Sequence, residues 1–203
     1  MIPLISQYWD DSDMVKSLKN HVSEITLAQY EGRAPGSEGE KEVSEYVWKT
    51  MSDKGLDMLC GMEGDVFGMA APSGDTLISR NVIGMLRGYD SSLRNNYIVI
   101  GARLDNIGTN RLMVDGNPVT QIYSGANGNA SGLAIMLEVA SRLAESSIML
   151  KRSVIFVGFG ASTSSFAGAW HFLHGTFAKD KERISAMVNL DMLGVSGDGM
   201  KAF

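Results

Sequence analysis

Hydrophobic and polar residues follow a helical period in several stretches of this chain. Apolar residues recur every three or four positions over 12–28 and over 129–145, so both stretches predict amphipathic helices. Another helix is predicted after Ser37, because Ser37 and Glu40 form the S-x-x-E pattern of a capping box. We expect that helix to end near Gly55, since glycine is common just beyond a helix end.

Continuous apolar runs predict the strands. Runs rich in β-branched residues are typical of strands buried on both faces, and they occur at 97–105, 153–161 and 186–194. Residues 56–70 and 76–87 predict two further strands on either side of the turn APSGD. Strands that alternate with helices predict an α/β fold, here a three-layer α/β/α arrangement around a mixed central sheet.

Two segments between these elements have a less regular pattern. Residues 106–124 contain glycines and a proline, and we interpret them as an irregular insert. Residues 164–177 predict a helix with these residues facing inward: Phe166, Trp170, Leu173 and Phe177. No internal repeat divides the chain, so residues 1–203 are predicted to form a single domain.

Composition and charge narrow the classes of partner. The net charge is −5 with the charges scattered, which argues against a nucleic-acid partner. No apolar stretch is long enough to predict a membrane span, and the start MIPLISQYWDDSD lacks the pattern of a signal peptide. The single cysteine, Cys60, rules out an intrachain disulfide, and we interpret it as a half-buried small hydrophobic residue.

Polar residues with chemical potential follow each buried apolar run. In α/β sheets, binding groups gather at the carboxyl ends of the parallel strands. The loop 124–129 precedes a predicted helix and would present that helix start to the same crevice. The candidates after the three runs are Arg103 and Asp105, then Ser162 and Thr163, then Asp191.

Six motifs carry a family resemblance, in the order EGRAPGSEGE, NVIGMLRG, YIVIGARLD, SGANGNASGLAIMLEVASRLA, VIFVGFGASTSSFAGAWHFL and VNLDMLG. This order resembles the co-catalytic di-zinc aminopeptidases, whose relatives include the glutaminyl cyclases. The resemblance covers about residues 31–194. It implies the zinc-exopeptidase scaffold, of the phosphorylase/hydrolase-like type, with its C-terminal part missing from this chain. It also implies a location outside the cytoplasm, which the sequence itself does not specify.

The resemblance further implies where the zinc ligands would stand, and most of those positions differ here. Arg103 stands at the position of a zinc-binding histidine, while the neighbouring Asp105 is kept. Gly128, which follows Asn127, stands at the position of the acid that bridges the two zinc ions. The vestigial ligand positions are thus Arg103, Gly128, Thr163 and Asp191.

The acid–base residues of the resemblance are also replaced. Ser162 stands at the position of the general base and Thr163 at that of a metal-binding glutamate, while Asp191 is kept. The last histidine ligand has no counterpart, because no histidine follows His174. Zinc takes about four nitrogen, sulfur or carboxylate ligands, and a serine without an activating partner is a poor proton acceptor. We therefore expect no catalytic residue, no metal ligand set and no cofactor.

A catalytically inactive aminopeptidase-like domain that binds a peptide or a protein is the function that we predict. The expected binding crevice consists of Arg103, Asp105, Asn127, Gly128, Ser162, Thr163 and Asp191. We expect the Arg103 guanidinium to contact both Asp105 and Asp191, replacing the charge of the lost metals.

Other functions stay open. A zinc-dependent aminopeptidase would need ligands from elsewhere, for instance Asp115, Asp198 or another chain, with zinc as its cofactor. A purely structural domain is a further alternative, and a homodimer is compatible with the sequence. GFGASTS lacks the G-x-S-x-G pattern, which disfavours a serine hydrolase. We interpret His171 and His174 as polar-face residues, because no ligand pattern surrounds them.

Overall fold

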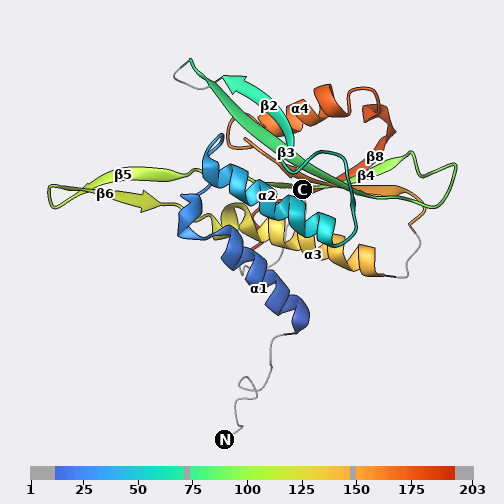
Figure 1. Ribbon diagram of the computed structural model, residues 1–203, viewed down its shortest axis with the longest axis horizontal. Helices are drawn as coiled ribbons and strands as arrows, with labels where there is room; N and C mark the ends of the chain where they lie inside the picture. The colour runs from blue at the N-terminus through green and yellow to red at the C-terminus, as the bar shows by residue number, and fades with distance from the viewer. Residues whose placement is uncertain (1–11, 71–73, 147–149, 195–203) are drawn as a thin grey trace, which may run out of the picture.

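A mixed six-stranded sheet forms the centre of the protein, as the sequence predicts (Figure 1). The computed structural model describes residues 12–70, 74–146 and 150–194. The sheet order is β1-β3-β7-β4-β8, with β2 paired to β3. β4 runs parallel to β7 and β8, whereas β3 runs antiparallel to β7. The strands of this sheet are β1 (Asp57–Met58), β2 (Asp65–Ala70), β3 (Thr76–Leu86), β4 (Tyr97–Arg103), β7 (Ser153–Phe159) and β8 (Ile184–Leu190).

Helices cover both faces of the sheet, which confirms the three-layer prediction (Figure 1). The main helices, α1 (Asp13–Ile25), α2 (Glu38–Asp53) and α3 (Ser131–Glu145), pack on one face around the larger core. The shorter α4 (Ala167–His171) and η4 (Phe172–Thr176) cover the other face. The remaining single turns are η2 (Ala28–Tyr30), η3 (Ala126–Ala130) and η5 (Lys181–Arg183). Among the described residues, no helix combines the length and the hydropathy of a membrane span.

Strand β8 is exposed, although its apolar sequence predicts burial on both faces. The central strand β7 is buried along its whole length, and β4 is mostly buried. β8 instead lies at the edge of the sheet, and Met187 and Val188 on its opposite faces are both exposed. The prediction was wrong because an apolar run can only be buried where another element covers it, and no described element covers this edge.

The inward face of the 164–177 segment also differs from the prediction. Phe166 is 71% exposed and Trp170 is 64% exposed, whereas Phe177 is buried as expected. The glycine of α4 sets the orientation, because the Gly168 amide donates to the Gly160 carbonyl at 3.1 Å and a Cβ there would clash with that oxygen. The face that packs inward therefore contains Gly168 and Phe172. Leu173 is exposed, as Phe166 and Trp170 are, so the prediction was wrong for these three residues.

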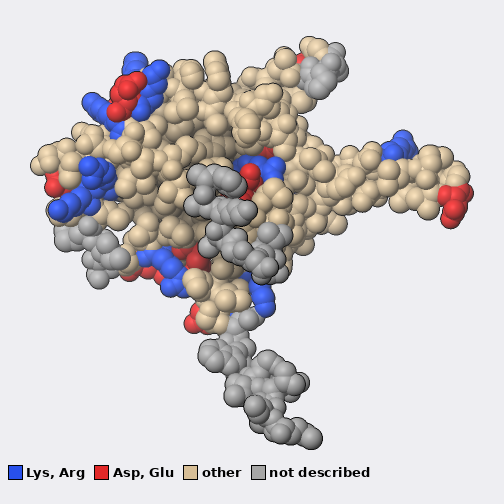
Figure 2. All heavy atoms as spheres, turned by 180° about the vertical axis from the view of Figure 1, so that it is seen from behind, with Lys and Arg blue, Asp and Glu red and all other residues tan. Residues whose placement is uncertain are grey.

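The segment 106–124 is a β-hairpin rather than an irregular insert. Strands β5 (Thr109–Val114) and β6 (Asn117–Ile122) are joined by a two-residue turn. Asp115 and Gly116 in this turn have φ values of 50° and 80°, as a type I′ turn requires. Asp-Gly between two short strands is a local hairpin signal that the sequence analysis missed. The hairpin forms an arm that projects from the body of the protein (Figures 1 and 2).

A fully buried arginine fixes the backbone around the ends of these elements. The Arg33 guanidinium donates to four main-chain carbonyls, those of Ile25 (2.8 Å), Leu104 (3.2 Å), Ser124 (2.7 Å) and Gly125 (3.1 Å). These carbonyls belong to the end of α1, the residue after β4 and the loop before α3. Burial lowers the pKa of Arg33 to about 10, so the side chain remains charged at neutral pH.

Replacing Arg33 tests its structural role. Arg33→Met leaves four carbonyls without their donor, so we expect the free energy of unfolding to fall by roughly 3 kcal/mol or more. Arg33→Lys keeps the charge but not the planar set of donors, and we expect most of that loss to remain. Urea unfolding measures both changes. Arg142→Met, which removes an exposed ion pair with Glu138, is the control, and it should lower the free energy of unfolding by less than about 1 kcal/mol. An equal loss in Arg33→Met and Arg142→Met would contradict the structural role of Arg33.

Candidate binding crevice

The carboxyl ends of the parallel strands bring the predicted site residues to one edge of the sheet. Arg103 is the last residue of β4, and Asp105 follows two residues later. Ser162 and Thr163 follow β7, and Asp191 follows β8 directly. The turn η3, which contains Asn127 and Gly128, leads into α3 beside them.

Arg103 pairs with one of the two retained carboxylates. Its Nε donates to Oδ1 of Asp191 at 3.0 Å. The Arg103 side chain is 20% exposed and that of Asp191 is 45% exposed, so this ion pair lies at the mouth of the crevice rather than in the core. The contact joins the ends of β4 and β8. Among the described residues this is the one hydrogen bond that the Arg103 guanidinium donates, and its Nη2 atom lies beside Gly128.

Asp105 has other partners, which corrects the expectation that Arg103 would contact both acids. Asp105 is fully buried, and its Oδ1 accepts a hydrogen bond from the Ser162 amide at 2.7 Å. Its Oδ2 accepts from the Thr163 amide at 2.8 Å and from the Thr163 hydroxyl at 2.6 Å. Asp105 therefore orders the loop after β7 by accepting main-chain and hydroxyl donors.

Gly128 leaves room that the Arg103 guanidinium fills. A Cβ atom at position 128 would lie 3.2 Å from Arg103 Nη2 and 3.6 Å from Asn106 Oδ1. The first distance is tighter than ordinary van der Waals contact, so a side chain here would require the guanidinium to shift by a few tenths of an ångström. The arginine at 103 and the glycine at 128 are thus sterically matched.

Two asparagines tie the η3 turn to the segment after β8. The Asn127 side-chain oxygen accepts from the Gly194 amide at 2.8 Å. The buried Asn129 donates to the Leu190 carbonyl at 2.8 Å and accepts from the Met192 amide at 3.0 Å. Sequence reasoning missed Asn129, although a polar residue just before a helix start is a recognisable signal.

Glu40 is a second residue whose role the sequence did not reveal. The capping-box pattern predicts a bond back to the Ser37 amide, but the Glu40 carboxylate accepts from the Gly36 amide at 2.7 Å instead. It also accepts from the Ser79 hydroxyl at 2.8 Å and the Ala161 amide at 2.9 Å. Ser37 does cap α2, since its hydroxyl accepts from the Glu40 amide. Burial raises the pKa of Glu40, and the three donors oppose that shift.

The crevice beside Arg103 encloses about 280 Å³. Its polar end is formed by Arg103, Ser162 and Asp191. The other lining residues are Phe159, Phe166, Ala169, Met187 and Asn189. An apolar wall with a charged pair at one end is typical of a small-ligand or side-chain binding site.

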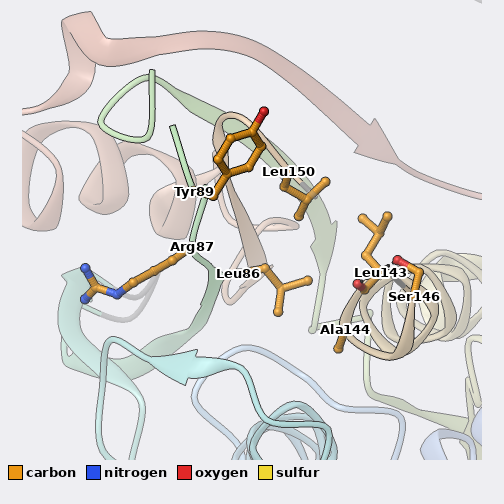
Figure 3. Close-up of a pocket in the computed structure, with 7 residues that line it drawn as sticks. All are labelled: Leu86, Arg87, Tyr89, Leu143, Ala144, Ser146 and Leu150. Atoms are coloured by element: carbon orange, nitrogen blue, oxygen red, sulfur yellow. Dashed lines mark hydrogen bonds between the residues drawn. The ribbon is translucent and has the colours of Figure 1, made fainter. Parts of the chain in front are cut away.

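Two other hollows lack a charged pair like that of the crevice among their described lining residues. One hollow, of about 220 Å³, lies between the end of β3 and the end of α3. Figure 3 shows that Arg87 points away from the leucines that line this hollow. Arg87 pairs instead with Asp57 at 2.7 Å. Another of about 420 Å³ lies between α1 and α3. In the described part of the chain, neither hollow is lined by an acidic residue or a histidine.

The donor set of the crevice does not fit a pair of zinc ions. At two positions where the resemblance implies zinc ligands, Arg103 offers a guanidinium and Gly128 no side chain, while Asp105 is fully engaged by neutral donors. Over residues 12–70, 74–146 and 150–194, no group of three or more potential ligand side chains is placed to hold a metal. His171 bonds to Asp65 at 3.3 Å, and His174 stacks on Trp170, so neither belongs to the crevice.

Comparison with known proteins identifies the family. A family model described as Peptidase family M28 matches residues 81–202, which is more than half of the chain. The chain belongs to peptidase family M28. M28 membership agrees with the resemblance seen in the motifs.

M28 relatives include named aminopeptidases. The chain is 32% identical over 100 residues to an aminopeptidase of Pseudomonas aeruginosa, covering 49% of this chain and 16% of that protein. It is 36% identical over 72 residues to aminopeptidase YwaD of Bacillus subtilis, covering 36% and 15% respectively. The chain thus spans about a sixth of the length of these curated relatives.

Solved structures share the fold of this M28 chain. A zinc aminopeptidase from Bacillus subtilis superposes with a TM-score of 0.69 at 14% identity, covering 88% of this chain and 69% of that one. The glutaminyl cyclase of Porphyromonas gingivalis gives a TM-score of 0.65 at 18% identity, covering 92% and 62%. At these identities the likeness establishes the fold alone, and it confirms the zinc-exopeptidase scaffold.

A double-mutant cycle tests the steric match between Arg103 and Gly128. Alanine at 128 reduces the freedom of the unfolded chain, which favours folding where the site has room. In the wild type the added methyl group crowds the guanidinium, so we expect Gly128→Ala to destabilise the fold. In an Arg103→Ala background the same change should be neutral or stabilising, with a coupling of roughly 0.5–1 kcal/mol in urea unfolding. Strictly additive effects would refute the match.

Stability as a function of pH tests the burial of Glu40. Because its pKa is raised on folding, the folded protein holds this proton more tightly than the unfolded chain. The stabilisation is therefore complete below the ordinary pKa of about 4.5 and is lost as the pH rises through the folded-state pKa. Relative to Glu40→Gln, the wild type should lose stability over that range in urea titrations. Glu38→Gln, at an exposed position of the same helix, should leave the pH profile unchanged.

Proposed function

We propose that this M28 chain is a catalytically inactive domain that binds peptides in the crevice beside Arg103. The observation that carries the proposal is the Arg103–Asp191 ion pair, with Gly128 providing the room for the guanidinium. A permanent cation at a ligand position disfavours a divalent ion by charge repulsion. The chain has the M28 scaffold, but its crevice lacks the donor set that zinc binding and zinc catalysis need.

The position of the general base supports the same conclusion. The Ser162 hydroxyl donates to the Phe159 carbonyl at 3.3 Å, and the Ser162 amide is bound to Asp105. Neither contact would activate the hydroxyl as a base or as a nucleophile. We therefore derive no hydrolytic step for this site.

The polar end of the crevice is complementary to a peptide group. Arg103 and Asp191 both line this end, so one amide could accept from the guanidinium through its carbonyl and donate to the carboxylate through its N–H. The wall formed by Phe159, Phe166 and Met187 suits an apolar side chain of that peptide. Phe166 is both exposed and held at a φ of 55°, a strained conformation of the kind that recurs at ligand sites.

The enzyme alternative rests on the named activities of the relatives. It requires zinc ligands from outside the crevice, and Asp115 lies at the turn of the projecting arm. Asp198 lies outside the described residues. A ligand supplied by a second chain would complete such a site, and the assay below distinguishes that case. The structural-domain alternative predicts no ligand at all.

Metal content and turnover provide the first test. After incubation with excess zinc and dialysis, we expect no stoichiometric zinc by elemental analysis and no hydrolysis of aminoacyl-nitroanilides. The protein is assayed at high and low concentration, so that a site shared between chains is also detected. Stoichiometric zinc together with turnover that disappears in Asp191→Ala would overturn the proposal.

Peptide binding provides the second test. We expect a library of short peptides, read by fluorescence anisotropy, to yield binders that contain an apolar residue. Arg103→Met and Phe166→Ala should each weaken binding about tenfold or more, because each removes one side of the crevice. Arg142→Met, which alters an exposed ion pair elsewhere, should bind as the wild type does. An absence of binders, or equal losses in all three variants, would favour the structural domain instead.

A further inference from the structure

The β5–β6 arm exposes an apolar sheet surface that the rest of the described chain leaves uncovered. Every residue of its two strands is exposed. A two-stranded hairpin is marginally stable alone in water, so an arm of this kind gains stability when it pairs. Figure 2 shows that its surface is mostly uncharged, with its charges toward the outer end. Its exposed large apolar residues are Leu112, Met113, Val114, Val119 and Ile122, and Met113 is 69% exposed.

The two edges of the arm differ in their capacity for strand pairing. The two-residue turn makes Val114 and Asn117 a hydrogen-bonded pair, and such pairs alternate along the hairpin. The N–H and C=O groups of Arg111 and Met113 therefore point outward from β5. On β6 the corresponding outward residues are Thr120 and Pro118, and Pro118, which lies opposite Met113, has no N–H. Pro118 therefore hinders the pairing of another strand with the β6 edge, whereas the β5 edge can accept one.

We propose that a second copy of this chain pairs with the open edge of β5. The two β5 strands run antiparallel about a two-fold axis, as an isologous dimer requires. The axis passes Met113, so that Met113 lies opposite Met113 of the partner subunit. The result is a four-stranded intermolecular sheet in the order β6-β5-β5-β6.

The charge pattern selects this register. With Met113 on the axis, Arg111 lies opposite Asp115 of the partner subunit, and the contact occurs twice. Moving the axis to Arg111 would place like charges opposite each other, which is unfavourable. Moving it to Leu112 would place Arg111 opposite Met113 of the partner subunit and lose the contact between Arg111 and Asp115.

The same register gathers the exposed aliphatic residues. Leu112 lies opposite Val114 of the partner subunit, and Val119 lies beside Leu112 within the hairpin. Six aliphatic side chains, three from each copy, then form one cluster on a single face of the new sheet. The arm projects away from its own body, which leaves the cluster to a second molecule (Figure 1). The Arg111–Asp115 complementarity favours a second copy over an unrelated partner.

Proline substitution tests the open edge. Met113→Pro removes an outward N–H from β5 and leaves the bonds within the hairpin intact, as Pro118 does on β6. Thr120→Pro makes the matched change on the β6 edge. Sedimentation velocity should show a wild-type dimer that dissociates on dilution, since the interface is small. Thr120→Pro should retain the dimer and Met113→Pro should be monomeric. A wild type that is monomeric at every concentration, or a dimer that survives Met113→Pro, would overturn the proposal.

Disulfide trapping tests the register. In a Cys60→Ser background, Met113→Cys places two thiols across the axis, within the Cα separation that a disulfide allows. We expect Met113→Cys to form a covalent dimer under mild oxidation and Thr120→Cys to stay monomeric on denaturing gels. Efficient trapping of Thr120→Cys, or none with Met113→Cys, would show that the copies do not meet along β5.

Discussion

One guanidinium joins the ends of two parallel strands and places a fixed positive charge in the crevice between them. Arg103 at the end of β4 donates to Asp191 after β8 at 3.0 Å, and Gly128 leaves the space that the side chain fills. A half-exposed ion pair of this kind contributes little to stability. Its consequence is chemical, because it places a fixed positive charge where the M28 resemblance implies a metal ligand.

Hydrogen bonds from polar side chains hold the loops around that pair. Arg33 binds the carbonyls before α3 and after β4, Asp105 binds the amides after β7, and Asn129 binds the segment after β8. Each of these side chains supplies a hydrogen-bond partner to main-chain groups of these loops. The crevice is therefore shaped by hydrogen bonds within the chain, which is compatible with ligand binding in the absence of zinc chemistry.

The sequence predicted the sheet and the location of the crevice better than it predicted exposure. The apolar runs of β4 and β7 identified buried strands, and the polar residues that follow them meet because parallel strands end at one edge. Exposure of Met187 and Phe166 could not be predicted, because it depends on which elements pack nearby rather than on local pattern. The role of Glu40 depends on Ala161, far away in the sequence. The Asp115–Gly116 turn, in contrast, was a local signal, and attention to it would have predicted the β5–β6 hairpin.

The crevice and the arm are two separate surfaces of this M28 chain, and we propose a small ligand for the first and strand pairing for the second. The central claim concerns the crevice, and anomalous diffraction at the zinc edge tests it most directly. In crystals grown with zinc, the account predicts no anomalous peak beside Asp191 and an Arg103 guanidinium still bonded to that carboxylate. Two well-occupied zinc peaks in the crevice, with Arg103 displaced, would contradict it.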